Sequence, residues 1–265
     1  MNSVFRPATP LPLLFIASLL AMFAFSPVYA EVPTKQLSLE GISELSFKGD
    51  AQVTLIQSSD NTAIIRVIKG ELEDVEFETD GDSVSISNRG LGFWSWFKND
   101  NGSEVEIEIS IAQISHIAAS GNIRLNSASI ETEHLTLDVS GSSQITIGAV
   151  AAETLGLDAS GAVTVTFAAV EAQTMSVDIS GASHASVSNA GVVHTQSIDV
   201  SGASHYNAGS VISEQVGVDV SGASFVKVQV RQQLSADVSG ASSLEYTGDP
   251  RMSLNTSGAS TINKL

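Results

Sequence analysis

The chain has 265 residues, no cysteine, and 29 Asp and Glu against 12 Lys and Arg, which gives a formal net charge of −17 at pH 7. So acidic a chain does not bind nucleic acid or anionic lipid through its general field, and its natural electrostatic partners are cations or basic surfaces. The absence of cysteine excludes a disulfide framework and a lipid-modified cysteine, so stability must come from packing.

Residues 1–30 are typical of a secretory signal peptide. Arg6 makes a short basic region, residues 11–25 are apolar, and small residues lead to a predicted cleavage site between Ala30 and Glu31. A membrane anchor is the alternative, but the apolar stretch is shorter than the roughly 20 residues that a span needs. The sequence therefore predicts an exported chain in the periplasm, at the cell surface or secreted.

The mature chain, residues 31–265, is expected to form a single domain, because no linker divides it. Residues 36–118 carry short β-rich segments without a strict repeat. Asp80-Gly81 lies between two of these segments and predicts a hairpin turn, since tight hairpin turns need positive φ. Residues 105–111 alternate apolar and acidic side chains, so Glu106 and its acidic neighbours are expected to face outward.

A loop at residues 90–102 contains both tryptophans of the chain. Exposed rings in such a loop make contacts with sugars or proteins, because they bury a large area at little entropic cost. The alternative is that the rings fold back as a lid on the rest of the domain. The candidate ligand-contact residues are Phe93, Trp94, Trp96 and Phe97, and the candidate partners are a carbohydrate or an envelope protein.

Residues 119–264 are built from repeats of the type Asp-Val-Ser-Gly-Ala-Ser, spaced 18 to 21 residues apart. A period near 20 residues indicates a solenoid, in which each unit buries its apolar face against its neighbours. Apolar residues alternate on both sides of each Ser-Gly pair, which is the period of a strand. The Ser-Gly pairs lie at residues 120–121, 140–141, 160–161, 180–181, 201–202, 221–222, 239–240 and 257–258.

The predicted fold is therefore all-β, a parallel β-solenoid (β-helix) of about 20-residue rungs that follows an N-terminal strand region, with helix only in the signal peptide. Glycine is expected at each corner because a sharp bend often needs positive φ. By the same alternation Phe167, Ile179 and Leu254 face inward, whereas Thr136 faces outward.

An aspartate stands two residues before most of the Ser-Gly pairs. Stacked rungs would bring neighbouring carboxylates to roughly 5 Å, where each pair repels by about 1 kcal/mol in water. Two arrangements could offset this repulsion: each carboxylate caps the N–H groups of its own corner, or a cation such as Ca²⁺ binds between rungs. The repeats lack the glycine-rich nonapeptides of calcium-loaded solenoids. The ladder comprises Asp138, Asp158, Asp178, Asp199, Asp219 and Asp237.

His184 and His205 each stand four residues after the serine of a Ser-Gly pair. They are therefore expected to stack on adjacent rungs and to face outward. Two histidines alone seldom make a metal site. The sequence therefore predicts no metal site and no cofactor.

The segments FKGDAQVTLIQ, VEIEI and IAASGNI, together with the serial DVSGAS rungs, resemble the bacterial putative adhesin family called the head GIN domain. The resemblance covers roughly residues 36–264. It implies an exported β-solenoid, grouped by likeness with the heads of trimeric autotransporter adhesins. It carries over no catalytic motif.

Three functional classes are compatible with these patterns, and a non-enzymatic binding or adhesion module is favoured. A structural envelope protein and a polysaccharide-acting β-helix enzyme are the alternatives, and the oligomeric state is open. Enzymes on parallel β-helices use clustered aspartates with a basic residue. Here the aspartates recur on every rung, whereas an active site interrupts the period once.

Overall fold

The computed structural model describes residues 32–88 and 104–265, and residues 32–265 form one compact unit. In these two ranges the regular elements are strands, apart from the 3-10 turn η1 (Leu72–Asp74), and none is a helix long and apolar enough to cross a membrane. Outside the described residues lie the predicted leader with Ala30 and Glu31, and the predicted contact residues Phe93, Trp94, Trp96 and Phe97.

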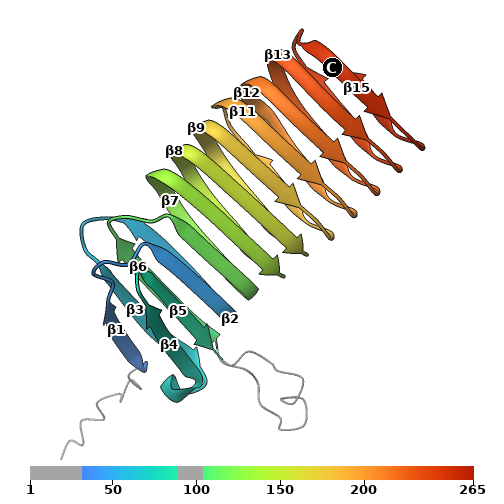
Figure 1. The fold of residues 1–265 in the computed structure, drawn as a ribbon. Helices are drawn as coiled ribbons and strands as arrows, with labels where there is room; N and C mark the ends of the chain where they lie inside the picture. The colour runs from blue at the N-terminus through green and yellow to red at the C-terminus, as the bar shows by residue number, and fades with distance from the viewer. Residues whose placement is uncertain (1–31, 89–103) are drawn as a thin grey trace, which may run out of the picture. The chain divides into compact units, whose positions relative to one another are not determined.

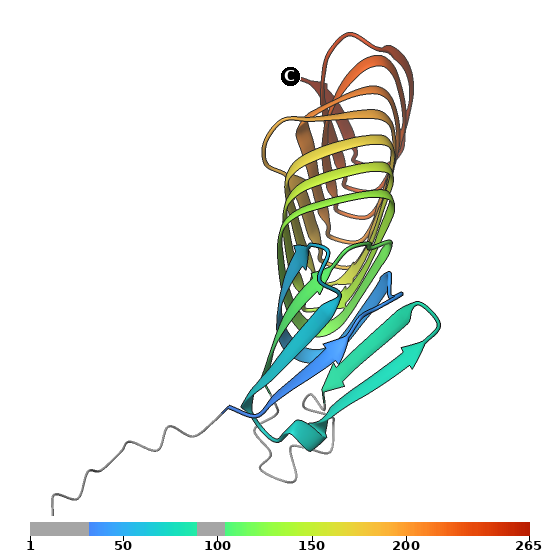
Figure 2. The ribbon, with the colours of Figure 1, turned by 90° about the vertical axis from the view of Figure 1, so that its left-hand side faces the viewer.

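The body of the unit is a parallel β-solenoid of about seven turns, as predicted. Successive rungs lie side by side in Figure 1, and Figure 2 shows them winding around a common interior. Its strands are β2 (Glu44–Gln57), β7 (His116–Gly141), β8 (Gln144–Gly161), β9 (Thr164–Ile179), β10 (His184–Val187), β11 (Gly191–Val200), β12 (His205–Val220), β13 (Phe225–Val238), β14 (Ser243–Thr247), β15 (Arg251–Thr256) and β16 (Thr261–Lys264).

The corner glycines stack directly on one another, and all eight glycines of the Ser-Gly pairs have positive φ, between 75° and 106°. A side chain would be excluded for a second reason, because a Cβ on Gly181 would lie 2.5 Å from the carbonyl oxygen of Gly161 one rung earlier. The corner thus needs glycine both for its left-handed backbone and for the close approach of the rungs.

The stack begins one rung before the Ser-Gly repeat, which the sequence did not predict. Gly49 pairs with Gly121 in parallel register and has a φ of 109°. Asn88 caps this first corner, because its Oδ1 accepts a hydrogen bond from the Asp50 N–H at 2.8 Å and its Nδ2 donates to the Asp50 carbonyl at 2.5 Å. The segment from Glu44 to Gln57 is therefore a true rung whose corner lacks the serine that marks the others.

The remaining N-terminal strands join this first rung through β5 (Ser83–Asn88) and β6 (Glu104–Ile111), which both pair in parallel with β2. β1 (Thr34–Ser38), β3 (Thr62–Lys69) and β6 pair through antiparallel β1–β3 and β3–β6 ladders. β4 (Val75–Asp80) and β5 form the predicted hairpin, with its turn at Gly81-Asp82 rather than at Asp80-Gly81. The acidic side chains of β6 face outward as expected, and Glu108 lies 3.3 Å from Arg66.

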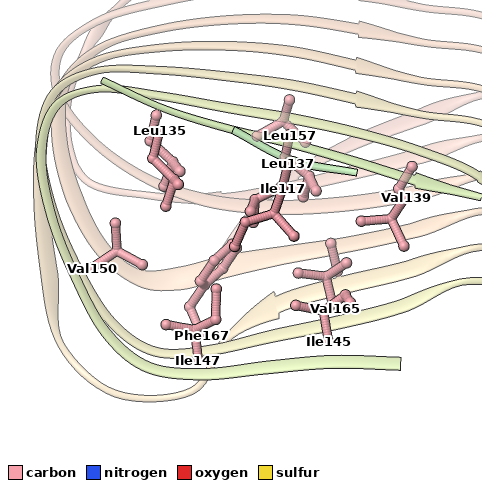
Figure 3. Close-up of a cluster of buried hydrophobic side chains, with 14 of the residues drawn as sticks. Ile117, Leu135, Leu137, Val139, Ile145, Ile147, Val150, Leu157, Val165 and Phe167 are labelled. Atoms are coloured by element: carbon pink, nitrogen blue, oxygen red, sulfur yellow. The ribbon is translucent and has the colours of Figure 1, made fainter. Parts of the chain in front are cut away.

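One hydrophobic core runs through the rungs. Figure 3 shows Ile145, Ile147, Val165 and Phe167 among the side chains that fill the interior. Phe167 is 1% exposed and Ile179 is fully buried, which confirms the predicted register, and Thr136 is exposed. Leu254 was predicted to face inward like its equivalents but is 42% exposed, because no further strand in the described chain packs beyond β15.

Differences in rung length are absorbed away from the corners. The 21-residue rung has its break between β10 and β11, at residues 188–190. The register between β12 and β13 shifts between Ala208 and Ile212 and again between Ser213 and Gln215. The Ser-Gly corners and the aspartate strands stay in register throughout.

Candidate functional site

The six aspartates lie in register on adjacent parallel strands. Asp178 pairs with Asp158 on one side and with Asp199 on the other, and all six side chains are exposed. A polar partner stands at each end of the row. His116 Nε2 lies 2.8 Å from Asp138 Oδ2. At the other end, Asn255 Nδ2 donates a hydrogen bond to Asp237 Oδ1 at 2.8 Å.

The prediction that each aspartate caps its own Ser-Gly corner is wrong. The N–H groups of the corner donate to carbonyls of the preceding rung, as Ala182 does to Gly161 at 2.8 Å and Ser180 does to Ala159 at 2.9 Å. Within residues 32–88 and 104–265 no ladder carboxylate accepts a hydrogen bond from its own corner. The parallel ladder simply continues around the bend, so these donors are already satisfied.

A buried row of serines stabilises the corner instead. Ser183 Oγ donates to the carbonyl of Gly161 at 3.2 Å and accepts from the N–H of Val163 at 3.3 Å. The signal was the final serine of the repeated unit, to which the sequence reasoning gave no role. The row comprises Ser143, Ser183, Ser204, Ser224 and Ser242, each 2–3% exposed.

Repulsion within the aspartate ladder is therefore not relieved by capping. Burial, followed by the charges of Asp178 and Asp138, raises the pKa of Asp158 above its usual value of 3.8. The pKa of Asp199 is raised by burial and then by Asp178 and Asp219. Across the described chain, no group of three or more His, Cys, Asp or Glu side chains is arranged to hold a metal ion. The calcium alternative thus has no such group to support it.

His184 and His205 stack as predicted, with ring centroids 4.7 Å apart and planes at 17°. Phe225, which the sequence reasoning missed although it occupies the same position of the next rung, continues the stack at 4.5 Å and 18°. Burial, and then the neighbouring His184, lowers the pKa of His205. Because the ring faces cover one another, this column joins three rungs.

A groove runs along one face of the solenoid, across β7, β8, β9, β11 and β12. The groove consists of two adjoining hollows. The first has a volume of about 1270 Å³. The second has a volume of about 690 Å³, shares Glu131, Glu171 and Val192 with the first, and extends to Arg231. We call the two hollows together the groove. Its apolar lining includes Ala149, Ala151, Ala169, Val192 and Ile212, and its acidic lining consists of Glu131, Glu133, Glu153, Glu171 and Glu214.

The strand register explains why acidic and apolar side chains alternate in the groove. Ala151 pairs with Glu131 on one rung and with Glu171 on the next. Val192 follows in the same row between Glu171 and Ile212, and its side chain is 59% exposed. The lining therefore offers apolar contact and carboxylate oxygens within adjacent rungs.

Hydrogen bonds fix both ends of the groove. At one end Gln57 holds the backbone of Glu131, with its Nε2 donating to the carbonyl at 2.7 Å and its Oε1 accepting from the N–H at 2.8 Å. At the other end Glu214 Oε2 lies 3.1 Å from His194 Nδ1 and accepts from Gln232 Nε2 at 3.0 Å.

The other four groove carboxylates have no ion-pair partner within the described ranges, 32–88 and 104–265. Arg231 is the one Lys or Arg side chain among the residues that line the two hollows. The groove therefore presents uncompensated negative charge beside small apolar side chains. The sequence did not reveal it, because outward alanines and glutamates carry no chemical signature of their own. The four are Glu131, Glu133, Glu153 and Glu171.

Fold and groove together define an acidic, repeat-built β-solenoid with a lateral groove and a strictly periodic row of carboxylates. The chain belongs to the family described as putative auto-transporter adhesin, head GIN domain, whose sequence pattern matches residues 42–250. The resemblance seen in the sequence is thereby confirmed. A comparison with curated proteins gave no match.

Several crystal structures share the fold. A putative adhesin from Parabacteroides merdae ATCC 43184 is 14% identical, with a TM-score of 0.80 over 89% of this chain and 97% of that one. A putative adhesin from Parabacteroides distasonis ATCC 8503 is 17% identical, with a TM-score of 0.79 over 89% and 98%. A putative lipid binding protein from the same organism is 17% identical, with a TM-score of 0.69 over 88% and 96%. At these identities the likeness establishes the fold alone.

Proposed function

We propose that the chain is an exported, non-enzymatic, adhesin-like binding module of the bacterial cell envelope, and that its partner lies along the groove. The observation that carries the proposal is the groove lining, in which uncompensated carboxylates stand beside exposed apolar side chains such as Val192. Membership of an adhesin-like family supports a binding role. Export rests on the signal peptide predicted at residues 1–30.

The regularity of the molecule favours binding over catalysis. A lyase or hydrolase site needs one local group of carboxylates with a basic or acidic partner tuned for proton transfer. The aspartates recur in register on six rungs, and the groove carboxylates are spread over several rungs, as Glu133 and Glu153 are. A lining spread over several rungs suits an extended partner, which contacts more than one rung at once.

We propose a carbohydrate or an envelope protein as the partner, because hydroxyl groups and basic side chains both pair with carboxylates.

A second contact through Phe93, Trp94, Trp96 and Phe97 is proposed from the sequence alone. Trp94→Ala and Trp96→Ala should then weaken binding while stability changes by less than about 1 kcal/mol. Tryptophan fluorescence that iodide cannot quench, together with a large loss of stability, would exclude this contact.

Binding to a glycan array and to purified envelope proteins tests the proposal. Ala151→Trp places a large ring in the groove at an exposed position, so it should weaken binding at least tenfold without unfolding the chain. Ala162→Trp is the matched control, because Ala162 is an exposed alanine at a corner and does not line the groove. Equal binding by the two variants would exclude the groove. Absence of any ligand would favour the structural alternative.

A further inference from the structure

The groove has an acidic part and an apolar part. Glu131, Ala151 and Glu171 follow one another in register on three successive rungs. Val192 and Ile212 continue the same row on the next two rungs. Val192 is 59% exposed, so its side chain is available for contact. The row therefore changes from charged to apolar along the stack.

The acidic part has a second row of side chains beside the first. Glu133 and Glu153 each lie two residues farther along the strands of the first row, so their exposed side chains face the same way. Among the described residues that line the first hollow there is no Lys or Arg, and Arg231 lines only the second. Carboxylates about 4.8 Å apart on adjacent rungs repel one another. This part of the groove therefore favours a positively charged partner.

The carboxylates are spread along the stack, which suits a chain of positive charges rather than a single ion. In the described part of the chain, no three His, Cys, Asp or Glu side chains are arranged to hold a metal ion. Glu131 and Glu171 are two rungs apart, which is about 9.6 Å at the spacing of parallel strands.

An extended peptide has a matching period. In the polyproline II conformation every third side chain returns to the same face after about 9.3 Å. Basic side chains at the first and fourth positions of such a peptide would face Glu131 and Glu171. The seventh position, about 18.6 Å from the first, would lie near Ile212, which is four rungs and about 19.2 Å from Glu131.

We propose, on the basis of the binding function proposed for the groove, that its partner is an extended segment of a basic protein. Arg or Lys side chains of this segment pair with the carboxylates of the acidic part, and an apolar side chain covers Val192 and Ile212. Neutral hydroxyl groups of a carbohydrate would leave the negative charge uncompensated, whereas guanidinium groups pair with carboxylates in bidentate geometry. The carboxylates are those of Glu131, Glu133, Glu153 and Glu171.

Fluorescence anisotropy with a labelled peptide tests the proposal. The probe is the C-terminally amidated peptide Arg-Pro-Pro-Arg-Pro-Pro-Val, whose prolines favour the polyproline II conformation. The same peptide with both arginines replaced by glutamate is the control and should not bind. Binding of the arginine peptide should weaken as NaCl is added, because ion pairs at an exposed surface are screened.

Two double variants separate the groove from the general negative field of the chain. Glu131→Gln/Glu171→Gln removes two carboxylates two rungs apart in the groove and should weaken peptide binding at least tenfold. Asp178→Asn/Asp219→Asn removes two carboxylates at the same separation on the aspartate ladder, outside the groove, and should change binding less than twofold. All four positions are exposed, so circular dichroism should show both variants folded.

The apolar part is tested by Val192→Ser, a change at an exposed position. It should weaken binding of the valine peptide at least threefold and should leave unchanged a peptide that ends in serine instead. Absence of peptide binding to the wild-type chain would overturn the proposal, as would equal losses in the two double variants. If a glycan binds and Ala151→Trp abolishes its binding while the peptide does not bind, the groove keeps its binding function and a basic protein is excluded as its partner.

Discussion

Replacing the central aspartate of the ladder should make the protein more stable. Asp178 has a carboxylate neighbour on each adjacent rung, Asp158 and Asp199. At a strand spacing of about 4.8 Å, each neighbour costs about 0.9 kcal/mol in water. Screening at physiological ionic strength reduces this to about 0.5 kcal/mol, in the range of exposed ion pairs. Asp178→Asn removes both repulsions, so the free energy of unfolding should rise by about 1 kcal/mol.

The gain should depend on pH with a definite sign. Burial and neighbouring charges raise the pKa of Asp158 and Asp199, so the folded chain binds these protons more tightly than the unfolded chain. The folded state is therefore penalised above the raised values, and the penalty disappears below the usual value of 3.8. The advantage of Asp178→Asn should be complete near pH 7 and should shrink as the pH falls toward 3.8.

Urea unfolding followed by circular dichroism measures this difference at several pH values and salt concentrations. Asp60→Asn is the control, because Asp60 is exposed and lies outside the ladder. It should change stability by less than about 0.5 kcal/mol. Two results would refute the account of the ladder as unrelieved repulsion. One is a loss of stability in Asp178→Asn near pH 7. The other is a gain that persists both at the usual aspartate pKa of 3.8 and in about 1 M NaCl.

Three further predictions test the corner, the core and the ladder. Gly181→Ala should cost at least about 2 kcal/mol, because φ is 79° and the new Cβ would lie 2.5 Å from a backbone oxygen. Gly217→Ala, with no atom nearer than 4.0 Å, should stay within about 1 kcal/mol, and equal losses would contradict the corner argument. Phe167→Ala should cost roughly 3–5 kcal/mol, whereas Thr136→Ala should be nearly neutral in the same denaturant assay. CaCl₂ should raise the melting temperature no more than NaCl of equal ionic strength, and a calcium-specific rise lost in Asp178→Asn would establish cation binding.

Most of the fold could be predicted because each rung repeats the same physical requirements. Positive φ at the corner selects glycine, and inward positions select apolar side chains at a period of two. The rung around Gly49 was missed because Lys48 precedes the glycine and no aspartate marks the strand. Its corner is identified only by the strands that stack on it.

The surface features were less predictable, because they depend on where neighbouring rungs place ordinary side chains. The position of the aspartate row could be predicted from the sequence, but its hydrogen-bond partners could not. The local sequence does not show that the corner N–H groups donate to carbonyls of the preceding rung. The serine row and Phe225 repeat positions that were visible in the sequence, but their contacts extend across rungs. The groove is lined by residues of β7, β8, β9, β11 and β12 and by Gln57, which come from distant parts of the chain.

Because the corner glycines stack directly on one another, one rung can be deleted or duplicated as a whole. Gly121, Gly141 and Gly161 follow one another at intervals of 20 residues. An in-frame loss of residues 141–160 would place Gly161 on Gly121 with the inward and aspartate positions continued. Duplication would add a rung by the same route. Recombination between neighbouring repeats can therefore lengthen or shorten the groove in steps of about 4.8 Å without any other change to the fold.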